Sequence, residues 1–413
     1  MDSSSFNEIP IERLCKWVSS GSTPLRSRSD FYDGGVIDWY KTGELKDWYL
    51  DPAEERITEK ALKETSAKLF PSNTVLMAMY GDGKTITSMG ILRAPAATNQ
   101  ACLAMLVDEE VCDQRYFFYA LKGRRDLLLK VASGGAQRNL SGKLIKEFLL
   151  PAPSLPLQRL IAGILSAYDE LIENSQRRIR ILETMARALY REWFVHFRFP
   201  GHEHLPRVPS PLGEIPQGWE VQPFTEVADV LSGGTPKTST ADFWGGDIPF
   251  FTPRDAPSCF YVHDTEKHIT ELGLAKCASA LYAPDTVFIT ARGTVGKVAM
   301  PAIPMAMNQS CYALRGKAGI AQHYLFLLTL QQVDYLKTNT GGATFDTIIV
   351  DTFRRMQVVK PPLSLIARFT KQVQPTFEQV NTLQRQIQTL RRTRDLLLPR
   401  LLSGQIDVEA LPA

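Results

Sequence analysis

Two stretches of the chain place mostly apolar side chains in alternating steps of four and three residues, a spacing that gathers them on one face of an α-helix. In residues 155–200 this seam comprises Ile161, Leu165, Tyr168, Ile172, Ser175, Ile179, Leu182, Ala186, Leu189 and Trp193. In residues 362–413 it comprises Phe369, Val373, Thr376, Val380, Leu383, Ile387, Leu390, Arg394, Leu397 and Leu401. Pro375 predicts a kink or a later helix start, because proline lacks the N–H of a helical hydrogen bond. The pattern predicts two long helices that pack through this seam as a coiled coil.

The residues before each seam repeat one another. Both regions consist of short apolar runs separated by glycine and proline, which is typical of strands and turns. The matching runs, in the same order in both copies, are SGSTP (20–24) and SGGTP (232–236), ITE (57–59 and 269–271), NQ (99–100 and 308–309), and GGA (134–136 and 341–343). Because surface loops absorb insertions, these matches indicate two copies of one domain.

The change from strand-like to helical pattern defines five segments. They are a first domain (1–154), a helix (155–200), a linker too rich in proline and glycine for a regular element (201–218), a second domain (219–361) and a second helix (362–413). This order brings the second helix back alongside the first. We therefore expect an α+β protein with two related α/β domains joined by two long antiparallel helices and pseudo-two-fold symmetry. Such an arrangement suits a partner with two sites on an extended object, such as DNA.

Composition narrows the class of protein only modestly. The chain has 413 residues, 44% hydrophobic and 22% charged, as expected for a globular protein. A net charge of +3 does not by itself indicate a nucleic-acid partner. The six cysteines form no CxxC pair and no cluster with zinc-ligand spacing, so we expect no metal. The sequence shows neither a signal peptide nor an apolar run of roughly 18 residues, so we expect a cytoplasmic protein that does not contact the membrane.

One glycine-rich turn resembles a phosphate-binding loop. The run AMYGDGKT at residues 78–85 has Ala78 where the P-loop requires its first glycine. In the second copy Val298 follows Lys297, so the hydroxyl that would bind magnesium is missing as well. A duplicated strand and turn fits both copies better than a nucleotide site does.

Several turns and strand ends in both copies present side chains that suit DNA. Glycine lets the backbone approach a phosphate or base closely, and arginine, glutamine and asparagine pair with base edges. Solvated turn residues or packing contacts would account for the same pattern. Unlike residues in the two copies predict unlike DNA half-sites. The candidates are Lys41, Thr42, Lys84, Gln137, Arg138, Asn139, Arg254, Arg292, Thr294, Lys297 and Thr344.

Three further runs carry a family resemblance. They are LGEIPQGW at residues 212–219, LYREWFVHFRFPG at 189–201 and LPRLLSGQI at 398–406. With SGGTP following the first of them, the chain resembles the specificity subunits of Type I restriction-modification systems over essentially its whole length. The runs before the helices, PSLPLQR at 153–159 and PPLSLIAR at 361–368, depart from the family pattern where each helix starts.

The resemblance implies that each domain recognises one half of a split site in double-stranded DNA. It also implies that the helices dock two methyltransferase subunits, which restriction subunits then join. S-adenosylmethionine, ATP and magnesium would belong to those partners, and this chain would bind no cofactor and catalyse no reaction. Candidate docking residues on the helices are Arg187, Arg191, Trp193, Arg391 and Arg394. Arginines in such a pattern are more often a solvated helix face, and contact with phosphates between the half-sites is a further alternative.

Two other classes of protein remain as alternatives. A fused or unrecognised DNA-modifying enzyme would need a motif such as the Asn/Asp-Pro-Pro-aromatic run of adenine methyltransferases. The only Pro-Pro pair is Pro361-Pro362, which Leu363 follows. A structural coiled-coil protein such as an adhesin tip would need an export signal, which the sequence does not show.

The sequence generates a test of Arg138 as a base-reading residue. If its guanidinium makes a bidentate contact with guanine, Arg138→Ala should weaken binding by about 1 to 3 kcal/mol and relax one base position. Binding to a series of single-base site variants measures both effects. An equal loss on every sequence would instead indicate a phosphate contact.

Overall fold

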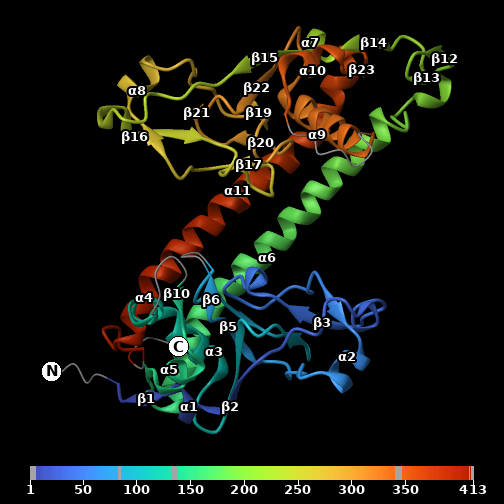
Figure 1. Ribbon diagram of the computed structural model, residues 1–413. Helices are drawn as coiled ribbons and strands as arrows, with labels where there is room; N and C mark the ends of the chain where they lie inside the picture. The colour runs from blue at the N-terminus through green and yellow to red at the C-terminus, as the bar shows by residue number, and fades with distance from the viewer. Residues whose placement is uncertain (1–5, 82–84, 133–137, 340–346, 409, 411–413) are drawn as a thin grey trace. The chain divides into compact units, whose positions relative to one another are not determined.

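The chain folds into two compact units, each containing one copy of the sequence repeat. The computed structural model describes residues 6–81, 85–132, 138–339, 347–408 and 410. Unit 1 comprises Met1–Ile172 and Thr389–Ala413, and unit 2 comprises Glu173–Gln388. Both units contain part of each of the two long helices labelled α6 and α11 in Figure 1.

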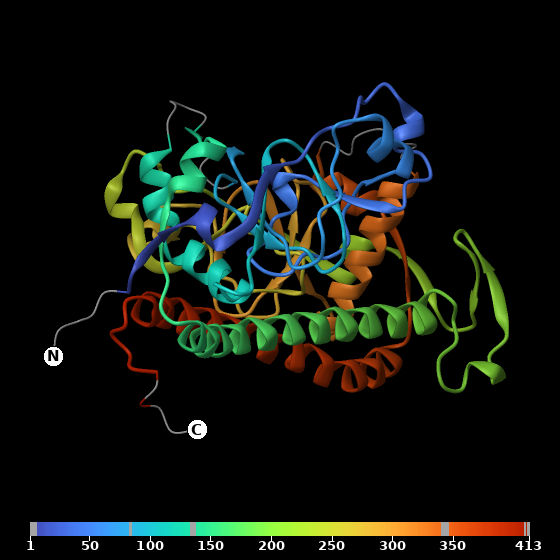
Figure 2. The same cartoon turned by 90° about the horizontal axis from the view of Figure 1, so that it is seen from below.

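Helices α6 (Leu155–Phe194) and α11 (Leu363–Leu402) are each 40 residues long, and Figure 2 shows both from a second side. Every position of the predicted seams is buried or half-buried, which confirms the periodic pattern. Helix α11 begins at Leu363, so the later start predicted from Pro375 is wrong. Phe369, Val373 and Phe377 are buried on both sides of the proline, and this packing stabilises the first turns despite one missing N–H.

Unit 1 is built on two small sheets and several short helices. The main sheet has the order β2-β9-β5-β7, and a second sheet has the order β4-β3-β8 with β3 and β8 parallel. Its strands are β1 (Glu8–Pro10), β2 (Cys15–Ser20), β3 (Ile37–Tyr40), β4 (Arg56–Ile57), β5 (Val75–Ala78), β6 (Tyr80–Gly81), β7 (Met89–Ile91), β8 (Ala97–Thr98), β9 (Cys102–Val107), β10 (Arg138–Asn139) and β11 (Leu149–Pro151). Its short helices are α1 (Ile11–Leu14), α2 (Glu59–Glu64), α3 (Gln114–Gly123), α4 (Arg125–Val131) and α5 (Gly142–Glu147).

Unit 2 repeats this topology. Its main sheet has the order β15-β22-β19-β20-β17, and its second sheet has the order β18-β16-β21 with β16 and β21 parallel. Its strands are β14 (Glu220–Pro223), β15 (Ala228–Ser232), β16 (Trp244–Phe251), β17 (Tyr261–Val262), β18 (His268–Ile269), β19 (Val287–Thr290), β20 (Val298–Pro301), β21 (Ala306–Met307), β22 (Cys311–Gly316) and β23 (Gln357–Lys360). Its short helices are α7 (Phe224–Val227), α8 (Glu271–Ala275), α9 (Gln322–Asn339) and α10 (Val350–Arg355). The shared strand order confirms the duplication predicted from sequence.

The stretch 201–218 contains a regular element that the sequence prediction missed. Strands β12 (Arg207–Ser210) and β13 (Gly213–Pro216) pair as an antiparallel hairpin. In a two-stranded ribbon each strand has one free edge, so Pro209 and Pro216 can lie where no N–H has to be donated. Gly213 has a φ of 96° next to the turn, a conformation that favours glycine. The prediction of a segment without regular structure is therefore wrong.

The two units hold the long helices by different chemistry. In unit 1 the buried Asp169 of α6 forms an ion pair with Arg394 of α11 and accepts a hydrogen bond of 2.7 Å from the Tyr119 hydroxyl. In unit 2 an aromatic cluster that includes Phe194 of α6 and Phe369 of α11 occupies the contact. The first half of α6 thus meets the end of α11, and its second half meets the start of α11, which is the predicted antiparallel arrangement.

In each unit, the segment that follows the first strand of the main sheet is hydrogen-bonded through its backbone to the second sheet. Ser22 N donates to Thr98 O at 2.9 Å, and Gly234 N donates to Met307 O at 3.0 Å. A Cβ on Gly21 would lie 2.0 Å from Thr98 O, and one on Gly233 would lie 2.1 Å from Asn308 O. The glycine that both motifs share is therefore required because no side chain fits between the two chain segments.

Because of this contact, alanine at Gly21 should change the stability of unit 1 differently from alanine at a glycine with open space around it. Gly21→Ala should lower the free energy of unfolding of unit 1 by about 1 to 3 kcal/mol, because the backbone must shift to admit a methyl group. Gly163→Ala is the matched control, since it lies on α6 with open space around its Cβ position. Alanine there should stabilise the helix by up to about 1 kcal/mol. Urea unfolding measures both, and equal effects would contradict the steric explanation.

Glu183 gives unit 2 a buried titrating group. One of its carboxylate oxygens accepts a hydrogen bond of 2.7 Å from Phe260 N, and burial raises the pKa of this carboxyl to about 7. The folded chain thus binds a proton that the unfolded chain has already released above its ordinary pKa of about 4.3. The stabilisation is complete below the unfolded pKa and is lost as the pH rises towards 7.

Glu183→Gln should remove this pH dependence, because the amide keeps an acceptor for Phe260 N but does not ionise. Between pH 4 and pH 8 the wild-type chain should lose roughly 3 kcal/mol of unfolding free energy relative to the glutamine variant. Denaturant unfolding at several pH values measures the difference. Glu226→Gln, at an exposed position of the same unit, is the control and should leave the pH profile unchanged. Parallel profiles for wild type and Glu183→Gln would refute the assignment.

Candidate nucleic-acid interface

The repeated motifs of each copy meet at the second sheet of its unit. Thr23 donates a hydrogen bond to the side-chain oxygen of Gln100 in unit 1, and Thr235 donates the same bond to Gln309 in unit 2. The sequence repeats SGSTP and NQ therefore form one local structure, present twice. Polar side chains from neighbouring loops surround both copies of this threonine–glutamine pair.

In unit 2 the surroundings form an open pocket of about 610 Å³. Its cationic members are Arg254, Lys267 and Arg292, and its aromatic members include Trp244, over which the Lys267 ammonium lies at 5.6 Å. Other lining residues are Thr235, Thr238, Phe250, Thr252, Pro253, Asp255, Glu266, Gly293, Thr294, Asn308, Gln309 and Ser310. The pocket thus combines positive charge, aromatic surface and several hydrogen-bonding side chains, which are the groups that bind nucleic acids.

The acidic Asp255 shapes this pocket from within. Its carboxylate accepts hydrogen bonds from Thr252 N and from the Thr252 hydroxyl, at 2.8 and 2.6 Å, and from Glu266 N at 2.8 Å. By contrast, Arg254 and Arg292 are exposed and form no ion pair within the part of the chain that the structure describes. The carboxylate is used to fix the loop, and the two guanidinium groups remain accessible.

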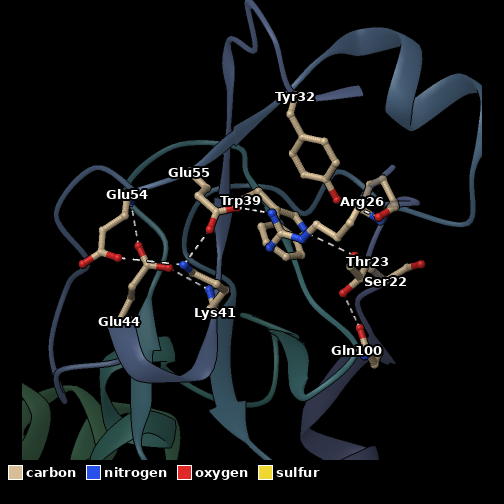
Figure 3. Close-up of polar contacts among 11 residues, drawn as sticks. Ser22, Thr23, Arg26, Tyr32, Trp39, Lys41, Glu44, Glu54, Glu55 and Gln100 are labelled. Atoms are coloured by element: carbon tan, nitrogen blue, oxygen red, sulfur yellow. Dashed lines mark hydrogen bonds and ion pairs between the residues drawn. The ribbon is translucent and has the colours of Figure 1, made fainter. Parts of the chain in front are cut away.

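In unit 1 the corresponding position is occupied by an ion-pair cluster (Figure 3). Glu55 accepts a hydrogen bond of 2.5 Å from Arg26 and one of 2.8 Å from Lys41, and the two cations hold the pKa of this carboxyl below its ordinary value. The Arg26 guanidinium lies 4.8 Å from the centres of both the Tyr32 and the Trp39 rings. Charged side chains gather at the same place in both units, and in unit 1 the two cations Arg26 and Lys41 form ion pairs with Glu55.

Backbone hydrogen bonds establish that these positions correspond. Trp39 N donates to Glu55 O at 3.0 Å in unit 1, and Phe250 N donates to Lys267 O at 2.9 Å in unit 2. Glu55 and Lys267 therefore occupy the same place in the repeated fold. One copy has a carboxylate there and the other has an ammonium group.

Four of the predicted candidates lie in the pocket of unit 2 or in the cluster of unit 1. The structure brings Arg254, Arg292 and Thr294 together in the pocket of unit 2, and places Lys41 in the cluster of unit 1. Thr42 lies next to Lys41, half-buried in the 3₁₀ turn Thr42–Glu44. Lys297 is exposed outside the pocket, and its ammonium donates to Ala256 O at 3.4 Å.

Other candidates lie elsewhere or cannot be placed. Arg138 and Asn139 form strand β10, which pairs with Gly81 and Tyr80 of β6, and Asn139 is exposed. Lys84, Gln137 and Thr344 lie outside the described residues. Sequence reasoning missed Arg26, Glu55 and Lys267, because no motif marks them. The repeated Thr-Pro and Asn-Gln runs beside them were the available signal.

Two predicted docking residues are corrected by their burial. Trp193 is 4% exposed and packs on Phe369, and Arg394 is 8% exposed and pairs with Asp169. Neither side chain is free to contact a partner subunit, because both complete the packing of α6 on α11. Arg187, Arg191 and Arg391 are exposed, with the Arg187 guanidinium 5.4 Å from the centre of the Phe260 ring.

The described ranges contain no group of three or more histidine, cysteine or acidic side chains placed to hold a metal ion. No helix among them is both long and apolar enough to span a bilayer.

Comparison with known proteins agrees with this geometry. The family model for the Type I restriction modification DNA specificity domain matches residues 4–184 and 216–389, one match for each copy of the repeat. The MjaIX specificity subunit of Methanocaldococcus jannaschii is 28% identical over 402 residues, covering 95% of this chain and 92% of the relative. The HindI specificity subunit of Haemophilus influenzae is 31% identical over 323 residues, covering 63% of this chain and 70% of the relative.

A solved structure shares the fold. The crystal structure of the Type I restriction-modification S subunit from M. genitalium has a TM-score of 0.57 at 16% identity and covers 97% of both chains. The family model spans most of the sequence in two segments, and the duplicated α+β architecture with two long helices agrees with it. The chain belongs to the specificity subunits of Type I restriction-modification systems, which recognise DNA and are not themselves catalytic.

Proposed function

We propose that this subunit recognises a bipartite site in double-stranded DNA, with one half-site bound by each unit at its threonine–glutamine pair. The observation that carries the proposal is that one polar site is built twice on the same framework but with different charged residues. Direct reading of bases requires a different set of donors and acceptors for each sequence. Two unlike sites on one framework therefore favour two unlike half-sites.

In unit 2 the exposed Arg254 and Arg292 would contact phosphates or guanine edges, and Thr294 would add a hydroxyl. In unit 1 Lys41 and Thr42 lie at the corresponding strand end, with Asn139 on β10. We retain Lys84, Gln137, Arg138, Lys297 and Thr344 as proposed contacts on the sequence argument alone. Each phosphate contact would make binding more sensitive to salt, because DNA releases counterions when it is neutralised.

The helices would carry the protein partners. Arg187, Arg191 and Arg391 are exposed on α6 and α11, so they can contact other subunits without disturbing the seam. We propose that two methyltransferase subunits dock there and that restriction subunits join this core in the cytoplasm. S-adenosylmethionine and ATP are used by those methyltransferase and restriction subunits. We propose that magnesium is bound there as well.

Exchange of one domain tests the assignment of one half-site to each unit. Replacing residues 219–361 by the equivalent domain of a family member with another target should change one half of the recognised sequence and leave the other half intact. Methylation mapping of DNA treated with the assembled complex measures the result. The reciprocal exchange of residues 1–154 is the control and should alter the opposite half. If either exchange changed both halves, the units would not read DNA independently.

A further inference from the structure

Arg26 is held in one orientation by three neighbours. Its guanidinium lies 4.8 Å from the centres of both the Tyr32 and Trp39 rings, and it donates a hydrogen bond to Glu55. The rings are fixed in turn by the loop that carries Arg26. The Tyr32 hydroxyl donates to Pro24 O at 2.6 Å, and Trp39 Nε1 donates to Ser22 O at 3.0 Å. A long side chain that is normally flexible is therefore positioned before any ligand arrives.

Most of the donors on Arg26 remain available. A guanidinium has five N–H groups. The bond to Glu55 is the only hydrogen bond that Arg26 makes within the described part of the chain, and the side chain is 51% exposed. Arg28, two residues along, differs. It makes two hydrogen bonds of 2.7 Å to Asp30 and one of 3.3 Å to Glu64. Arg28 therefore uses its donors within unit 1, whereas Arg26 is fixed in orientation and still has donors available for a ligand.

We propose that Arg26 reads a guanine in the half-site bound by unit 1, donating two hydrogen bonds to the O6 and N7 atoms of the base, and that Glu55 is its positioning residue. This inference rests on the proposed function, since it identifies a base contact within that DNA site. The planar fork of arginine matches the two acceptors of guanine in the major groove.

The charge around Arg26 favours a base over a phosphate. Glu55 is shared by Arg26 and Lys41, so its negative charge offsets part of the positive charge of the pair. A carboxylate beside the binding group repels the full negative charge of a phosphate much more strongly than the partial charges on the neutral edge of a base pair. The remaining free donors on Arg26 therefore suit guanine, which presents acceptors without a net charge.

Unit 2 does not repeat this arrangement. Lys267 occupies the position of Glu55, and Thr238 stands three residues after Thr235, where Arg26 stands three residues after Thr23. Without the positioned arginine and its carboxylate, unit 2 must recognise its half-site by other contacts. A change at Arg26 should consequently affect one base position in one half-site only.

The test uses the full chain assembled with its methyltransferase subunits. Affinity is measured for DNA duplexes in which each position of both half-sites is varied in turn. Arg26→Ala and Arg26→Lys should each reduce the preference for guanine at one position by on the order of 10- to 100-fold, because lysine keeps the charge but loses the fork. The other half-site should be read unchanged. Arg28→Ala is the matched control and should leave every base preference unaltered.

Glu55→Gln tests the positioning role separately, because it retains the size and one acceptor of the side chain. It should weaken the preference for guanine at the same position as Arg26→Ala does. It should also raise the affinity for unrelated DNA at low salt, since a charge that repels phosphates is removed. Thermal unfolding of each variant establishes that unit 1 is folded.

Several outcomes would overturn the proposal. An equal loss of affinity on all sequences for Arg26→Ala, with Arg26→Lys restoring it, would make Arg26 a phosphate contact. Unchanged base preferences in both Arg26 variants, or the same loss in Arg28→Ala, would exclude a reading role. If the wild-type complex showed no sequence preference, the proposed function itself would fail. A normal wild-type preference that Arg26 does not influence would refute only this inference.

Discussion

The burial of apolar side chains between α6 and α11 is the constraint on which the rest of the structure depends. The core of unit 1 contains Leu14 and Tyr116 from its own domain, Ile161 from α6, and Leu398 and Leu402 from α11. The main sheet of unit 1 is small, and these helical side chains contribute to the apolar core against which it packs. The second sheet has an apolar cluster of its own, which includes Phe31, Trp39 and Ile57.

Periodicity and repetition made the architecture predictable, but chemistry that arises only in three dimensions did not follow from them. The seam, the duplication and the strand-end positions of Arg254 and Arg292 were all readable, because each leaves a local pattern. The hairpin at 207–216 was missed, since its prolines and glycine argued for an irregular segment. The seam spacing correctly predicted that Arg394 lies in the contact between the two helices, although its charge suggested an exposed position. Only the structure shows that Asp169 and Asp395 pair with that charge, and that the Tyr119 hydroxyl donates to Asp169.

The two recognition sites show how a duplicated framework can diverge. Both units keep the threonine–glutamine pair and the close backbone contact at Gly21 and Gly233, because these contacts hold the loop against the second sheet. Glu55 and Lys267 share one backbone position but carry opposite charges. Neither side chain is needed for the strand pairing beneath it, so this position can change its chemistry without cost to the fold. The charged side chains of the site therefore differ between the units, while the backbone contacts that support them are the same.

The composition of the units also sets an order of events during synthesis. Unit 2 is one continuous segment, Glu173–Gln388, so it can complete its core once that segment has left the ribosome. Unit 1 begins earlier but waits for Thr389–Ala413, which contribute Leu398, Leu401 and Leu402 to its core. The first domain to emerge is thus the one whose core is completed last. A nonsense mutation near residue 389 would leave unit 2 complete but would remove from unit 1 the helical segment that completes its core.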